Sequence, residues 1–142
     1  ESRVSISPDG VKELTSHGHH VLVQSAAGHD IGFEDAHYQE AGAEIVLQAA
    51  DIFQRAELIV KVKEPQVSEY PMLRKNQMLF SYLHLAANRS VTDALRSSEC
   101  IAIAYETVTA EDGTLPLLAP MSEVAGRIAV QAGASCLERR AC

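Results

Sequence analysis

Short apolar runs alternate along the chain with more polar stretches that carry helix signals. Five runs have the length and composition of buried strands, and they cover residues 21–23, 44–46, 58–60, 78–80 and 101–103. Successive runs lie about 15–25 residues apart, a spacing typical of repeated βαβ units. The pattern predicts an α/β fold with an open, mostly parallel sheet that is flanked by helices.

Helix starts and stops fall between these runs. Ser7 can cap a helix, Pro8 suits its first position, and Asp9 suits its positive end. Gly18 is expected to end this helix. Further helices are expected over 35–41, ended by Gly42, over 50–55, and from Ser90 onward.

The last segment has a different pattern. Residues 121–140 contain no proline, and Val124, Ile128 and Leu137 recur near helical spacing with small residues between them. We expect one long helix that tertiary packing holds, because Gly126 and Gly133 lower its intrinsic propensity.

Composition narrows the classes of function. The net charge is −7 without a basic stripe, which argues against binding to nucleic acid or to an anionic membrane. No apolar run is long enough to cross a bilayer, and the chain opens without a secretory signal, so a cytoplasmic location is expected. Three cysteines without a C-x-x-C spacing, and His17, His19 and His20 without nearby ligands, predict no metal site.

Lys63 is the first candidate for chemistry. It follows the apolar stretch 58–62, which we expect to be buried on both faces, and it opens the turn Lys63-Glu64-Pro65. Ligands of open α/β sheets bind beyond the carboxyl ends of the strands. Lys63 is therefore either a cation that binds a carboxylate or polarises a carbonyl, or a solvated surface lysine.

His84 and Arg3 are the other candidates. His84 is the one histidine of six that sits among apolar residues, just past the run 78–80. It can serve as an acid or base near neutral pH, or it is a packed histidine satisfied by backbone groups. Arg3 can bind a carboxylate through two parallel hydrogen bonds, or it belongs to a frayed terminus.

Taken together, these stretches resemble the N-terminal domain of alanine dehydrogenases, whose superfamily also includes the alpha subunit of nicotinamide nucleotide transhydrogenase. The run Leu-Pro-Leu-Leu-Ala-Pro-Met-Ser-Glu-Val-Ala-Gly-Arg at 115–127 is the most specific and favours alanine dehydrogenase. The matching stretches occur in order along nearly the whole chain: 3–4, 7–8, 10–11, 18–19, 21–23, 41–43, 58–65, 78–87, 103–107 and 115–133.

The resemblance implies roles for particular residues. Arg3 and Lys63 would bind the substrate carboxylate, and His84 would be the catalytic acid–base residue. Leu118 and Met121 would lie near the substrate, and Ser122 near the NAD cofactor. The implied reaction is the reversible, NAD-dependent oxidative deamination of L-alanine to pyruvate and ammonium, in a homo-oligomer.

The resemblance also sets the expected extent. Family members begin with a strand before Arg3 and continue past Cys142 into a Rossmann domain that holds NAD and a second catalytic carboxylate. No G-x-G-x-x-G motif occurs in this sequence. We therefore expect residues 1–120 to be a substrate-binding domain without its first strand, 121–142 to lead towards the NAD domain, and this chain alone to be inactive. The alternatives are a transhydrogenase-like or degenerate non-catalytic binding domain, an interaction role for the long helix, and glycine or serine as substrate.

Overall fold

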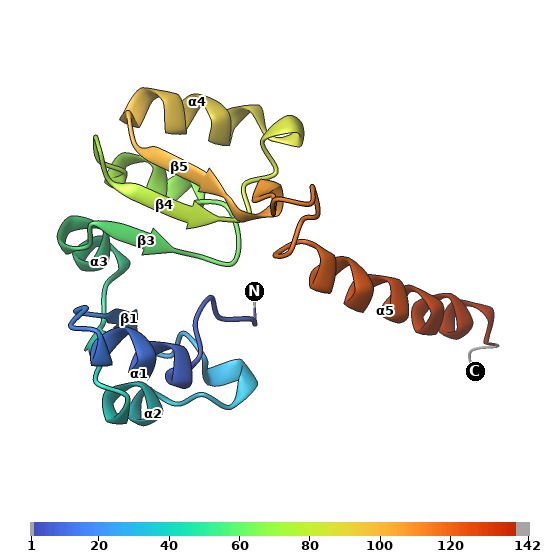
Figure 1. Cartoon of the computed structure of the whole chain (residues 1–142), viewed down its shortest axis with the longest axis horizontal. Coiled ribbons are helices and arrows are strands. Elements are labelled where there is room, and N and C mark those ends of the chain that lie inside the picture. Colours follow the sequence, from blue (N-terminus) through green and yellow to red (C-terminus); the bar gives the residue numbers. More distant parts are fainter. Residues whose placement is uncertain (1, 139–142) are drawn as a thin grey trace. The chain divides into compact units, whose positions relative to one another are not determined.

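The computed structural model describes residues 2–138, and the chain divides into two compact units, residues 1–104 and 105–142 (Figure 1). Among residues 2–138, the first unit contains the five strands and four α-helices, and the second contains one long α-helix. The predicted functional division into residues 1–120 and 121–142 stays a prediction.

The strands of the first unit pair in parallel. Strand β1 (Leu22–Gln24) pairs with β2 (Glu44–Val46). A second sheet has the order β3-β4-β5, formed by Leu58–Val60, Met78–Ser81 and Ile101–Ala104. The predicted α/β class is confirmed and each strand lies within one residue of its predicted bounds, but the strands form two small sheets instead of one.

Helices follow the capping residues closely. Helix α1 (Pro8–Ser16) is capped by Ser7, whose Oγ accepts the Gly10 N–H at 3.2 Å, as predicted. Helices α2 (Asp35–Glu40) and α3 (Ala49–Arg55) also form where expected. Helix α4 (Arg89–Ser98) starts one residue earlier than predicted because Asn88 caps it, accepting the Val91 N–H at 3.3 Å.

Four short 3-10 helices complete the connections. They are η1 (His29–Ile31), η2 (Val67–Met72), η3 (Leu85–Ala87) and η4 (Tyr105–Thr107). The η2 and η3 helices follow the turns that leave β3 and β4, so they form part of the surroundings of Lys63 and His84.

Two hydrophobic clusters hold the first unit. One centres on Leu79, which is fully buried, and joins β3 and β4 to α3 and α4: Phe53, Ile59, Leu73, Leu83, Val91 and Leu95. The other contains Val11, Val23, Tyr38 and Ala43, and the Tyr38 hydroxyl donates to the Ile6 carbonyl at 3.0 Å. Burial of apolar side chains of this size is the main term that stabilises such a unit.

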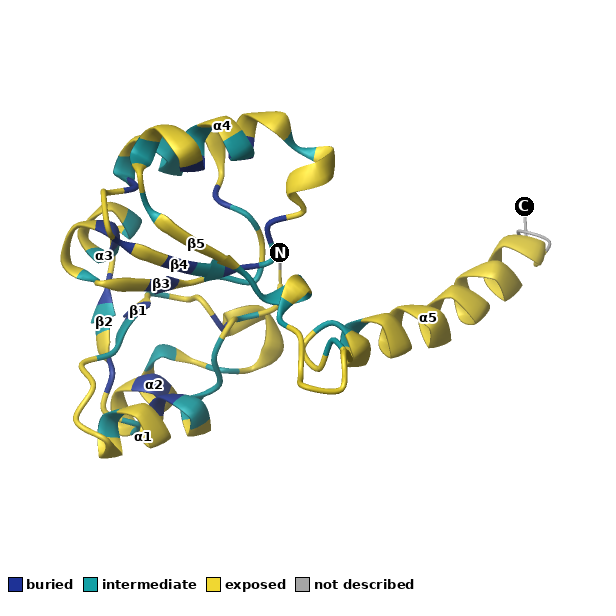
Figure 2. Cartoon of the chain, turned by 45° about the horizontal axis from the view of Figure 1, so that its top comes forward, coloured by how far each residue is buried: buried dark blue, intermediate teal, exposed yellow. Residues whose placement is uncertain are grey.

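The prediction that the strand at 58–62 is buried on both faces is wrong. Ile59 is 4% exposed, whereas its neighbours Leu58 and Val60 are 46% and 38% exposed. Successive side chains of a strand point to opposite faces, and the packed face is the one that contacts α3 and α4. The opposite face keeps further large side chains exposed in the described chain, namely Met78, Ile101 and Ile103. In Figure 2, β3 and β4 carry buried segments, whereas β5 is exposed along most of its length.

The second unit ends in α5 (Ala119–Leu137). The helix begins two residues before its predicted start, because Pro120 fits the first turn, where its missing N–H has no helical partner to lose. The last part of the predicted helix, residues 139–140, lies outside the described residues. None of the described residues of α5 is buried. No helix within residues 2–138 combines the length and apolar character that crossing a membrane requires.

Candidate functional site

The turn after β3 is fixed to the end of β4 by two hydrogen bonds. The Lys61 N–H donates to the Phe80 carbonyl at 3.1 Å, so pairing with β4 continues one residue beyond β3. The buried Ser81 hydroxyl donates to the Lys63 carbonyl at 2.6 Å. The backbone of Lys63 is therefore held at the carboxyl end of the sheet, where α/β proteins bind ligands.

Lys63 and His84 both contact the ring of Tyr82. The Lys63 Nζ lies 5.9 Å from the centroid of the Tyr82 ring. The Tyr82 ring stacks on the His84 imidazole with centroids 5.9 Å apart and an interplanar angle of 15°. Both predicted residues thus contact one aromatic side chain that the sequence reasoning did not single out. Its position two residues before His84, directly after β4, was the available signal.

His84 has a strained backbone and an exposed side chain. Its φ and ψ of 47° and 44° lie in the left-handed region, which few residues other than glycine adopt. The residue precedes η3 and turns the chain away from β4. The side chain is exposed, so His84 is not buried in the core. Such strain in non-glycine residues is concentrated at functional sites.

Arg3 belongs to an N-terminal segment that is held in place. Ser5 Oγ donates to the carbonyl of Val60, the last residue of β3, at 3.0 Å. Val4 and Ile6 pack against the cluster around Val11 and Tyr38. Arg3 itself is exposed and lies two residues before the anchor on β3.

Leu118, Met121 and Ser122 lie in the second unit, at the start of α5. Leu118 is the N-cap residue, and its carbonyl accepts the Ser122 N–H at 3.0 Å. Leu118 and Met121 are half-buried, and Ser122 is exposed. These three side chains therefore share the first turn of one helix.

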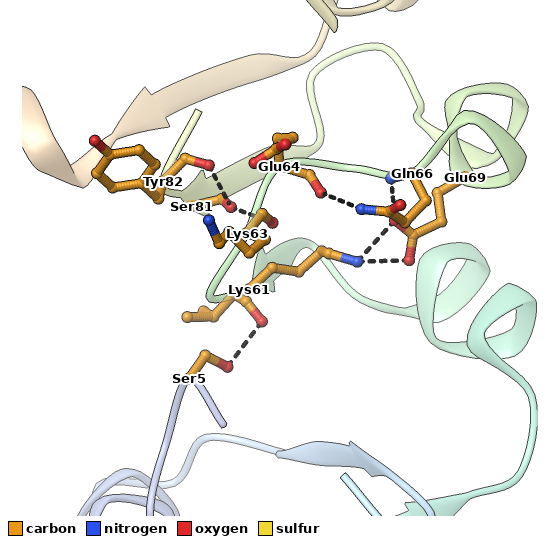
Figure 3. A network of polar contacts seen from close by, with 9 residues as sticks. Ser5, Lys61, Lys63, Glu64, Gln66, Glu69, Ser81 and Tyr82 are labelled. Atoms are coloured by element: carbon orange, nitrogen blue, oxygen red, sulfur yellow. Dashed lines mark hydrogen bonds and ion pairs between the residues drawn. The ribbon is translucent and has the colours of Figure 1, made fainter. Parts of the chain in front are cut away.

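A partly buried ion pair lies beside the turn and was also missed by the sequence reasoning. Lys61 Nζ lies 2.6 and 2.7 Å from the two carboxylate oxygens of Glu69 (Figure 3). The Gln66 N–H donates to the same carboxylate at 2.7 Å, which closes a capping box at the start of η2. The Gln-x-x-Glu spacing of 66–69 resembles known capping boxes and could have indicated this contact.

The described chain offers little for metal binding. Within residues 2–138, no group of three or more His, Cys, Asp or Glu side chains could hold a metal ion. Of the closely spaced histidines, His20 pairs with Glu44 at 3.1 Å, and His17 lies 3.6 Å from Glu13.

Comparison with known proteins identifies relatives of this chain. The family described as "Alanine dehydrogenase/PNT, N-terminal domain" matches residues 1–125. The alanine dehydrogenase of Halomonas elongata is 55% identical over 139 residues, which cover 98% of this chain and 38% of that protein. The alanine dehydrogenase of Mycolicibacterium smegmatis is 54% identical over the same shares of the two chains.

Solved structures agree with these relatives. An L-alanine dehydrogenase superposes with a TM-score of 0.92 at 49% identity, covering 99% of this chain and 38% of that one. A transhydrogenase from Sinorhizobium meliloti superposes with a TM-score of 0.69 at 30% identity, covering 75% of this chain and 31% of that one. The chain spans about 38% of the length of the curated relatives named above. The predicted resemblance is confirmed: the chain belongs to the alanine dehydrogenase/PNT N-terminal domain family.

Proposed function

We propose that this chain is the substrate-binding half of an NAD-dependent L-alanine dehydrogenase, which catalyses the reversible oxidative deamination of L-alanine to pyruvate and ammonium. The observation that carries the proposal is the meeting of Lys63 and His84 at Tyr82, beyond the carboxyl ends of two neighbouring parallel strands. A cation and a titratable ring at that edge are what a small amino acid and its keto acid require.

Lys63 and Arg3 bind the substrate carboxylate in this proposal. Alanine and pyruvate have few groups that a protein can hold, so the carboxylate must fix their orientation. An ammonium and a guanidinium form charge-assisted hydrogen bonds with a carboxylate, and these are stronger than neutral ones. The two anchors at the end of β3, Ser81 on Lys63 and Ser5 on Val60, support such a role because they limit the movement of both segments.

His84 moves the protons. Removal of a hydride from the alpha carbon of alanine yields an imine, to which water adds before ammonium leaves. Deprotonation of the alanine ammonium before hydride transfer, addition of water to the imine and departure of the nitrogen each move a proton at the substrate nitrogen or oxygen, and an exposed imidazole can accept and return such a proton. NAD supplies the hydride acceptor when it is bound.

The described residues do not form an NAD site by themselves. The glycines Gly126 and Gly133 lie inside α5, and no strand-to-helix turn in the described chain has the G-x-G-x-x-G pattern. We propose only that Ser122 contacts the cofactor, and that Leu118 and Met121 give the substrate methyl group apolar contacts in the full-length enzyme. On the same resemblance, we propose a cytoplasmic homo-oligomer.

A transhydrogenase-like domain is the second candidate, since a transhydrogenase also superposes on this chain. The higher TM-score and identity of the L-alanine dehydrogenase favour the first candidate. The alternative of a degenerate binding domain is disfavoured by the presence of Lys63 and His84 at one aromatic ring.

The test uses the full-length polypeptide that contains these residues. NADH formation is followed with NAD and L-alanine, glycine or L-serine, and the reverse reaction with pyruvate, ammonium and NADH. Hydride exchange between NADH and an NADP analogue is measured in parallel. We expect turnover with L-alanine and none in the exchange assay. Hydride exchange without turnover of alanine would change the assignment to a transhydrogenase. Binding of alanine or pyruvate without either activity would indicate a degenerate relative.

A further inference from the structure

The ion pair between Lys61 and Glu69 is unusually well shielded for this chain. Its two side chains are 24% and 14% exposed. By comparison, the pair Arg55–Glu44 is 43% and 42% exposed, and the pair Lys75–Glu99 is 65% and 62% exposed. Exposed pairs contribute little, so a partly buried pair with two close contacts needs a separate explanation.

Glu69 joins the two ends of the turn that contains Lys63. One end is Lys61, directly after β3, whose ammonium binds both Glu69 oxygens. The other end is Gln66, the N-cap of η2, whose N–H donates to Glu69 Oε2. Residues 62–65 lie between these two points. A single carboxylate thus closes the turn on one side, while Ser81 holds it on the other.

The two lysines of the turn are used differently. The Lys61 side chain runs to Glu69, whereas the Lys63 side chain runs the other way, towards Tyr82 (Figure 3). The charge of Lys61 is neutralised by Glu69. Lys63 is exposed and forms no ion pair with any residue of 2–138. The turn therefore offers one uncompensated ammonium at the end of the sheet.

Stability alone does not account for this arrangement. Two charges lose water when they are buried, and an apolar pair of similar volume is often as stable. What an ion pair adds is a defined geometry, because its hydrogen bonds are lost when either charged group moves away from the other. A turn that must hold an ammonium at a fixed point benefits from that property.

We propose that Glu69 is a positioning residue for Lys63: by binding Lys61 and the N-cap of η2 together, it neutralises one lysine and fixes the turn that presents the other to the carboxylate of the substrate. This inference rests on the function proposed above.

The test is a double-mutant cycle in the full-length enzyme. Glu69→Gln, Lys63→Met and the double variant are compared for the affinity of pyruvate for the enzyme–NADH complex, measured by calorimetry without ammonium. Glu69→Gln should weaken pyruvate binding about tenfold, leave the affinity for NADH unchanged, and have no further effect once Lys63 is Met. Glu69→Asp, which keeps the charge, should recover part of the loss. Glu99→Gln, which breaks an exposed pair, is the matched control and should match the wild type.

Two charge-conserving variants cover the case in which Glu69→Gln does not fold. Lys61→Arg and Glu69→Asp keep both charges and alter only the geometry, and each should weaken pyruvate binding by about threefold, again only when Lys63 is present. Unchanged pyruvate affinity in these variants overturns the inference, as does an equal loss with and without Lys63. A wild-type enzyme that does not bind pyruvate overturns the proposed function and this inference together. A wild-type enzyme that binds pyruvate, with normal Glu69 variants, overturns this inference alone.

Discussion

The turn after β3 and the first turn of α5 both carry residues proposed to touch the substrate, yet they are built differently. The turn after β3 is held by side chains from elsewhere in its unit: Ser81 binds the Lys63 carbonyl, and Glu69 binds Lys61. The first turn of α5 has no side-chain cap at Leu118, and the N–H groups of Ala119 and Ser122 donate to the backbone carbonyls of Leu115 and Leu118, four residues earlier. The contrast teaches that the first unit fixes its proposed site through contacts between residues far apart in the sequence, whereas the first turn of α5 is organised by backbone hydrogen bonds between near neighbours in the sequence.

The largest effect should come from the first unit, at the residue that precedes η3. His84→Ala removes the proposed acid–base group, and alanine-dependent NADH formation should fall by about 10²–10⁴-fold. Binding of NAD, measured by fluorescence titration, should stay close to that of the wild type. His19→Ala is the control, since His19 is an exposed histidine of the same unit. Near-normal turnover of His84→Ala would show that the acid–base assignment is wrong.

Ser81→Ala should have the next largest effect. Its hydroxyl is fully buried and donates to the Lys63 carbonyl at 2.6 Å, so its loss leaves that carbonyl without this donor. We expect a loss of roughly 1–3 kcal/mol in stability in urea unfolding and a higher KM for pyruvate. Ser98→Ala is the control, because the Ser98 hydroxyl donates within its own helix, to the Leu95 carbonyl. A variant with the wild-type KM would mean that this hydrogen bond does not position Lys63.

Met121→Ala probes the second of the two compared regions, the first turn of α5. The side chain is half-buried in the first turn of α5 and is proposed to contact the substrate methyl group. Loss of one such apolar contact should raise the KM for alanine by about tenfold, the lower end of the roughly 10–200-fold range seen for a methylene in a pocket, and leave kcat nearly unchanged. Val124→Ala, an exposed position on the same helix, serves as the reference. A loss as large as that of His84→Ala would remove the distinction between the two regions.

The smallest effect is expected at Asp35, which belongs to neither of the two compared regions. Asp35 accepts the Ser25 hydroxyl and the Ala26 N–H, both at 2.7 Å, and these hydrogen bonds hold the pKa of its carboxyl below the usual range. A depressed native pKa stabilises the fold above the unfolded pKa of about 3.9, and this contribution is lost as the pH falls through the native pKa. Asp35→Asn should therefore be slightly less stable than the wild type at pH near 7 in thermal unfolding, and the difference should shrink below pH of about 4. Activity should not change. A stability difference that grew on acidification would contradict a depressed pKa of Asp35 in the folded protein.

Sequence reasoning located the strands and the strand-end residues because both depend on local pattern. The apolar runs and the Lys63-Glu64-Pro65 turn are visible in the chain, and the parallel pairing of β3 with β4 follows from their spacing. Burial of both faces of β3 was wrongly predicted, because an apolar run does not reveal whether anything covers its second face.

The contacts that organise the site depend on tertiary structure. Tyr82 reaches Lys63 only because β3 and β4 are neighbours, and Glu69 reaches Lys61 only because η2 folds back along the turn. The proposed roles of Leu118, Met121 and Ser122 came from the family resemblance alone, since a helix start gives no such signal by itself.

The uncovered side of the β3-β4-β5 sheet has a practical consequence. Leu58, Met78, Ile101 and Ile103 present adjoining apolar side chains to water on strands that pair directly. A polypeptide of these 142 residues, purified without any other segment, would bind hydrophobic fluorescent dyes. It would also adsorb to plastic surfaces and precipitate when it is concentrated. Polar substitutions at Leu58 and Ile101, two outward positions of this sheet, are the direct way to obtain a well-behaved sample for spectroscopy.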